Sequence, residues 1–172
     1  MGKVFINIIV SLSIIFLVTN IAEGQIQKPG VTLGGYVIYA TPKGDFGKAF
    51  KFGGGGEVFG GVGLGKTFII ATAGFSRFKQ QSSSHSGPVT YTPFKVGVRQ
   101  FILGKIIFIN ADLGRATVKS ETFNEMCFTR GVGIGAKLLG MQAALYYDGW
   151  KNKKVSGFSN SMNIKVGWGL SL

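Results

Sequence analysis

The sequence predicts an all-β protein, an eight-stranded antiparallel up-and-down β-barrel that crosses a membrane. Segments of about ten residues alternate apolar and polar side chains, and a period of two is the period of a strand. The connections between these segments alternate between short glycine-containing turns and longer polar stretches. The chain is 45% hydrophobic, yet nothing after its N-terminal region reads as a helical membrane span.

An export signal is predicted at residues 1–24. Lys3 supplies a positive charge, residues 4–18 are apolar, and Ala22 and Gly24 place small side chains at a cleavage site. The apolar run is too short, and too soon followed by polar residues, for a membrane anchor. We therefore expect residues 25–172 to form the exported barrel domain.

The clearest strand lies between residues 162 and 172, where apolar side chains alternate with polar or very small ones. A helix would scatter the same residues around its axis. The first strand-like segment has apolar residues on both faces, so its facing stays open. The pattern predicts eight strands, at residues 31–41, 52–64, 67–78, 91–102, 106–117, 128–139, 141–150 and 161–172.

The connections predict which end of the barrel is which. Gly65, Gly104 and Gly140 mark three tight hairpin turns. The other four connections are longer and polar, at residues 42–51, 79–90, 118–127 and 151–160. Short turns at one end and longer loops at the other are typical of an outer-membrane barrel with periplasmic termini.

With these features in place, residues 25–172 resemble the small eight-stranded outer-membrane barrels of the OmpA/OmpX type. The most specific part is similar to the C-terminal insertion signal of that family: Lys165, Gly167, Leu170 and Leu172. That family usually ends in Phe, whereas this chain ends in Leu172. The resemblance implies a Gram-negative outer membrane and recognition of this segment by the barrel insertion machinery.

The alternation assigns seven charged side chains to the lumen, which eight strands leave just wide enough for side chains to fill. Because unpaired buried charges are costly, we expect a salt-bridged lumen rather than a pore. The hairpin at Gly104 would bring Asp112 close to Lys95 and Arg99. The predicted lumen charges are Glu57, Lys95, Arg99, Asp112, Lys137, Asp148 and Lys165.

Three arginines, Arg77, Arg115 and Arg130, share the alternation phase of the apolar residues. Each lies about ten residues from its nearest tight turn, a rise of roughly 25 Å along a tilted strand. We therefore expect an outward-facing ring at the outer rim. Since arginine binds phosphate with a bidentate fork, we hypothesise contact with the lipid A phosphates of lipopolysaccharide; snorkelling of strand-end arginines is the simpler alternative.

The net charge of +12 favours an anionic partner, and export favours a membrane surface over nucleic acid. Residues 60–67 match the Walker A pattern, but strand-like residues follow where a phosphate-binding helix is required, so we interpret them as a hairpin. Cys127 is the sole cysteine, which excludes a disulfide framework. No metal-ligand spacing is present, and we expect no cofactor.

The leading functional hypothesis is a monomeric, non-enzymatic outer-membrane barrel with a structural or surface-interaction role. A second is a lipid A-modifying enzyme that uses His85, which lies in a serine-rich loop. A third is a soluble lipocalin-like barrel, whose apolar face would line a ligand cavity. Alternation alone does not choose between an inward and an outward apolar face, but the connection lengths and the last strand favour the membrane barrel.

Overall fold

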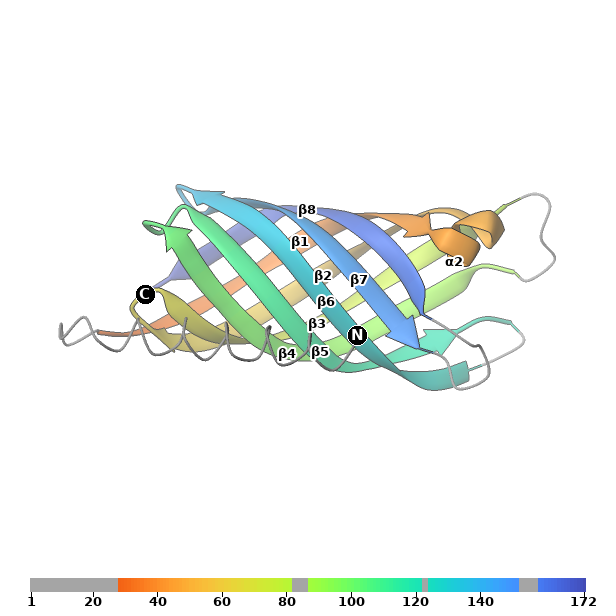
Figure 1. The fold of residues 1–172 in the computed structure, drawn as a ribbon, viewed down its shortest axis with the longest axis horizontal. Coiled ribbons are helices and arrows are strands. Elements are labelled where there is room, and N and C mark those ends of the chain that lie inside the picture. Colours follow the sequence, from red (N-terminus) through yellow and green to blue (C-terminus); the bar gives the residue numbers. More distant parts are fainter. Residues whose placement is uncertain (1–27, 82–86, 122–123, 152–157) are drawn as a thin grey trace, which may run out of the picture.

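A computed structural model describes residues 28–81, 87–121, 124–151 and 158–172, which form one closed antiparallel barrel (Figure 1). This confirms the predicted fold class, while the predicted export signal lies outside the described residues. The elements are β1 (Pro29–Lys43), α2 (Gly44–Ala49), β2 (Phe50–Leu64), β3 (Thr67–Gln80), β4 (Val89–Leu103), β5 (Ile107–Lys119), β6 (Asn124–Leu138), β7 (Met141–Lys151) and β8 (Ser159–Ser171).

Each strand pairs with the next, and β8 pairs with β1 to close the barrel. Following the register partners of Thr32 once around the barrel leads back to Pro42 in the same strand. This offset of ten residues is the shear of the barrel. Strand number and shear together fix the tilt and the diameter, and eight strands leave an interior that side chains can fill.

The pleat of each strand turns mostly apolar side chains outward and a mixture of polar, charged and aromatic side chains inward. Outward residues such as Val37, Ile69 and Leu113 are more than half exposed, while the interior holds aromatic and charged residues. In β1, whose facing the sequence left open, Tyr36 and Ile38 point inward. A water-soluble lipocalin-like barrel would have the opposite arrangement, with its apolar face inside.

The two ends of the barrel differ as the sequence predicts (Figure 1). Three short turns join β2 to β3, β4 to β5 and β6 to β7, and Gly65, Gly104 and Gly140 have positive φ angles there. In the last of these turns Leu139 also has a positive φ of 50°, as a type I′ turn requires of both central residues.

The strands extend further toward the outer end than the sequence predicts. β6 begins at Asn124 rather than near residue 128, because its ladder with β5 continues as far as Lys119. The connection predicted at residues 42–51 is mostly strand and the short helix α2. Among the described residues, no helix is long and apolar enough to cross a membrane.

Helix α2 carries Phe46 to the outer mouth of the barrel. Its ring centroid lies 4.7 Å from that of Phe50, 5.0 Å from Phe78 and 4.9 Å from Trp150. Tyr91 stacks on Trp150, with the two ring centroids 4.6 Å apart. These aromatic side chains fill the lumen at its outer end, above the charged layer.

Candidate functional site

The charged layer of the lumen begins with Lys95, which points inward from β4 and is 1% exposed. Its Nζ lies 2.8 Å from Oδ1 of Asp148 on β7 and 3.1 Å from Oδ1 of Asp112 on β5. Asn163 Nδ2 donates to the second oxygen of Asp148 at 2.6 Å. One ammonium group thus contacts two carboxylates, and the pair with Asp148 crosses the lumen.

A second ion pair joins β8 to β2. Lys165 Nζ donates to both carboxylate oxygens of Glu57, at 2.9 and 2.8 Å, and both residues are buried. The ring of Tyr146 lies between the two lysines, with its centroid 3.8 Å from Lys165 Nζ and 5.7 Å from Lys95 Nζ. Its π face attracts both cations, which adds to the ion pairs.

Arg99 differs from the lysines because, among the described residues, no carboxylate pairs with it. Its guanidinium donates instead to three neutral groups: Asn110 Oδ1 at 3.0 Å, Gln142 Oε1 at 3.2 Å and Tyr36 Oη at 3.3 Å. The guanidinium carbon also lies 4.6 Å from the ring centroid of Phe59 and 4.3 Å from that of Phe108. A delocalised, weakly hydrated cation tolerates such a site better than an ammonium group would.

The clusters around Arg99 and the lysines are continuous, because Asn110 also donates to the hydroxyl of Tyr146. Three buried cations, Lys95, Arg99 and Lys165, face three buried carboxylates. Below them Phe68, Phe101 and Phe108 form a second aromatic layer, with neighbouring centroids 6.0 and 5.7 Å apart. At these levels the lumen is filled by buried charged and aromatic side chains.

The structure brings together six of the seven predicted lumen charges and leaves Lys137 out. Lys137 is half-buried near the short-turn end, where its Nζ donates to Ser171 Oγ at 2.7 Å. Asp112 lies diagonally opposite both Lys95 and Arg99 in the β4–β5 register, but only Lys95 forms an ion pair with it.

Sequence reasoning did not single out the neutral members of this network, which are Tyr36, Asn110, Gln142, Tyr146 and Asn163. For four of them the alternation phase was a usable signal, since they share the phase of the inward charges. Tyr36 lies in the first strand, where the phase was ambiguous.

The three predicted rim arginines are exposed and point outward, from β3, β5 and β6. Arg115 and Arg130 are diagonal neighbours, since Arg130 pairs in register with Leu113. Arg130 lies over the ring of Phe158, at 4.1 Å from its centroid. Among the described residues, no carboxylate pairs with any of the three arginines.

The four residues of the predicted insertion signal divide between the two faces. Lys165 and Gly167 point inward, and a Cβ added at Gly167 would lie only 1.9 Å from the carbonyl oxygen of Gly35. Leu170 and Leu172 are exposed. The finished barrel therefore has its own packing requirement for a glycine at position 167.

The remaining motifs show no catalytic arrangement in the part of the chain that the structure describes. Residues 60–67 form a β2–β3 hairpin, without the helix that a Walker A loop needs. No three His, Cys, Asp or Glu side chains among the described residues are grouped as metal ligands would be. His85 lies outside the described residues.

Comparison with solved structures finds small outer-membrane barrels. The chain is similar to the outer membrane protein Ail of Yersinia pestis in a phospholipid bilayer nanodisc, with 16% identity, a TM-score of 0.54, and coverage of 84% of this chain and 99% of that one. It is also similar to the crystal structure of Ail, the attachment invasion locus protein, with 14% identity, a TM-score of 0.51, and coverage of 85% and 100%. Neisserial surface protein A gives 12% identity, a TM-score of 0.47, and coverage of 84% and 96%.

No protein-family model matches the chain, and no significant match is found among curated proteins. The likeness to the two Ail structures concerns the fold. It confirms the resemblance to small eight-stranded outer-membrane barrels.

Proposed function

We propose that the protein is an integral outer-membrane barrel without a catalytic role, and that its outer rim contacts the lipid A phosphates of lipopolysaccharide. The observation that carries this proposal is the outer face of the wall. A belt of exposed apolar side chains covers it, and Arg77, Arg115 and Arg130 point outward from the same strands with no described carboxylate beside them. Lipid chains would cover the apolar belt, and lipid phosphates would accept hydrogen bonds from the arginines.

The rest of the proposal concerns assembly and role. Residues 1–24 would be removed on export, and the insertion machinery would recognise Lys165, Gly167, Leu170 and Leu172. The barrel would act as a monomer, in envelope structure or in surface interaction. Ail, which shares the fold, is named for attachment and invasion, so the four outer connections are the place to test an attachment role.

Location is tested by fractionating cells and running the membrane fraction on a denaturing gel with and without boiling. A closed transmembrane barrel is expected in the outer-membrane fraction, with an unboiled band that migrates faster than the boiled one. A protein recovered in the periplasm or the medium would contradict the proposal.

Rim binding is tested by titrating the reconstituted barrel with lipopolysaccharide at several salt concentrations. Replacing Arg77, Arg115 and Arg130 by Gln should weaken binding roughly tenfold and reduce its salt dependence, since each exposed ionic contact contributes up to about 1 kcal/mol. The matched control removes three exposed charges at the short-turn end: Lys28, Lys66 and Lys105, each replaced by Gln. Equal weakening by both variants would show that net charge, not the rim, governs binding.

A further inference from the structure

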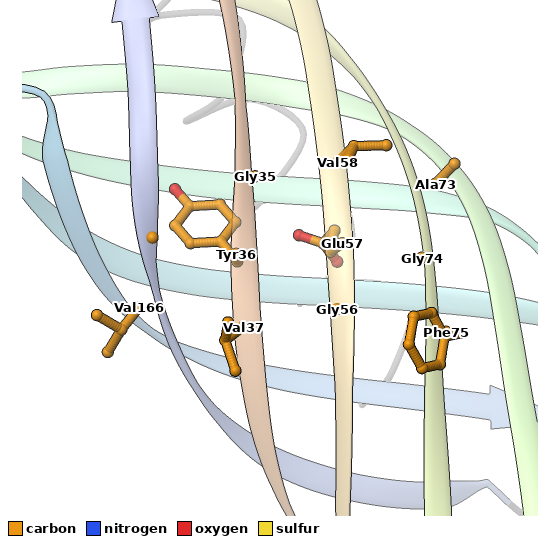
Figure 2. Close-up of a pocket in the computed structure, with 11 residues that line it drawn as sticks. Gly35, Tyr36, Val37, Gly56, Glu57, Val58, Ala73, Gly74, Phe75 and Val166 are labelled. Carbon is orange, nitrogen blue, oxygen red and sulfur yellow. The ribbon is translucent and has the colours of Figure 1, made fainter.

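The outer surface of the barrel carries a shallow groove lined in part by glycines. It crosses β8, β1, β2 and β3 and is open to the outside along its length, with a volume of about 480 Å³. Figure 2 shows Gly35 and Gly56, which have no side chain, among outward side chains that include Val37, Val58 and Phe75.

The steric requirement for glycine differs between the inner and the outer face of this wall. A Cβ added at the inward Gly55 would lie 1.9 Å from the carbonyl oxygen of Phe75, so the fold itself requires glycine there. A Cβ at the outward Gly56 would meet nothing closer than 3.5 Å, and one at Gly54 would meet nothing within 4 Å. The barrel could therefore accommodate larger side chains at these outward positions, and one at Gly56 would occupy the groove.

A cation lies at the outer end of the groove. Arg77 pairs in register with Gly54, and Phe75, the preceding outward residue of β3, pairs with Gly56 in the groove. Lys51 and Lys79 are exposed further out on the same two strands. The only acidic residue of β1, β2 and β3 is Glu57, which points into the lumen and is paired with Lys165.

We propose that this groove seats one acyl chain of an anionic, phosphate-bearing lipid, with the lipid phosphate on Arg77. The inference rests on the proposed membrane function. Arg77, at the outer end of the groove, favours an anionic lipid over an apolar protein segment, because such a segment would leave Arg77 without an anion. A lipid supplies both the phosphate and the chain that runs inward over Gly54, Gly56 and Gly35.

The barrel contains its own reporter for this site. Trp168 faces outward from β8 and is 52% exposed; its backbone pairs in register with Gly35, which lines the groove, and its ring lies beside Gly140 of the neighbouring turn. Trp150 is 3% exposed and faces the lumen, so lipid does not reach it. Bromine atoms on an acyl chain quench tryptophan fluorescence at short range, and quenching here reports on lipid beside Trp168.

The test reconstitutes the barrel in phosphatidylcholine vesicles that contain a minor fraction of lipid with brominated acyl chains. Quenching of Trp168 by brominated phosphatidylglycerol should be roughly threefold stronger than quenching by the same fraction of brominated phosphatidylcholine, as expected for one partly solvated ionic contact. Both Arg77→Gln and Gly56→Leu should abolish this preference, the first by removing the cation and the second by filling the groove.

Two controls carry matched changes elsewhere on the outer face. Lys119→Gln removes an exposed cation from the outer end of β5, and Ala111→Leu adds bulk at an exposed position of that strand. Both should retain the preference. No preference in the unmodified barrel, or equal loss in the controls, would overturn the proposed lipid seat. Absence of quenching even in fully brominated phosphatidylcholine would instead contradict the membrane function itself.

Discussion

On the inner face of the barrel wall, lysine ammonium groups lie within 3.1 Å of carboxylates, and glycines occur where a Cβ would collide with a neighbour. On the outer face, Arg77, Arg115 and Arg130 have no described carboxylate, and Gly54, Gly56 and Gly60 leave unused space. The inner face is thus determined by contacts within the chain. The outer face, in contrast, has space and cationic groups that the described part of the chain neither fills nor pairs with carboxylates.

The largest effect is expected for Lys95→Met. The change removes the cation that contacts both Asp112 and Asp148, and breaking a buried pair in this way costs about 3–5 kcal/mol of unfolding free energy. Urea unfolding of the micelle-bound barrel, followed by gel mobility, measures this cost. Lys79→Met is the control, because Lys79 only lies over the ring of Phe52 on the outer face. Similar losses in both variants would remove the distinction between the faces.

The next effect compares two glycines. A Cβ at the inward Gly133 would lie 2.5 Å from the ring of Tyr146, so Gly133→Ala should cost about 1–3 kcal/mol. A Cβ at the outward Gly60 would have 3.6 Å of clearance from Leu33, and Gly60→Ala should be neutral or stabilising by about 0.4–1 kcal/mol. The unfolding midpoint should therefore fall in Gly133→Ala and stay or rise in Gly60→Ala, and an equal fall in both would contradict the steric explanation.

A smaller gain is expected at the β6–β7 turn. Leu139 has a φ of 50°, a conformation that costs an ordinary L-residue about 1–2 kcal/mol, and its side chain is 85% exposed. Leu139→Asn creates the Asn-Gly pair that type I′ turns favour, so stability should rise by about 1 kcal/mol. Leu138→Asn, at an outward strand position, should give no gain. A loss in Leu139→Asn would mean that the exposed leucine contributes through lipid contact.

The smallest effect on stability is expected at the rim itself. Arg115→Gln should change the unfolding free energy by no more than about 0.5 kcal/mol, since the guanidinium has only a 3.8 Å contact with Met126 Sδ among the described residues. The same variant should still weaken lipopolysaccharide binding. A large loss of stability would mean that Arg115, like the lumen residues, is held by contacts within the chain.

Most of the fold could be predicted from the sequence, because a strand's period of two is a local property. The last strand shows it most clearly, with Trp168 and Leu170 on one face and Lys165 and Gly167 on the other. The first strand could not be assigned in this way, since Tyr36 and Ile38 fill the lumen with side chains as apolar as those facing out.

Features that depend on the third dimension could not be predicted. Alternation places Lys95 and Asp148 on the inner face, but only the closed circle of strands brings β4 and β7 opposite each other across the lumen. Helix α2 has six residues, too few for a periodic pattern, and Phe46 takes its place through contacts with distant strands. Arg99, Asn110 and Gln142 could be placed on the inner face, but the hydrogen bonds between them could not be predicted.

The ladder between β1 and β8 has a consequence for the order of events during assembly. It joins residues 32–43 to residues 160–171, so the seam of the barrel is also its longest-range pairing, and long loops make such pairing slow. Until that seam forms, β1 and β8 each present a row of unpaired backbone groups, which lipid does not satisfy. The half-built barrel therefore needs a temporary partner for its two open edges, or must insert and close in a single step.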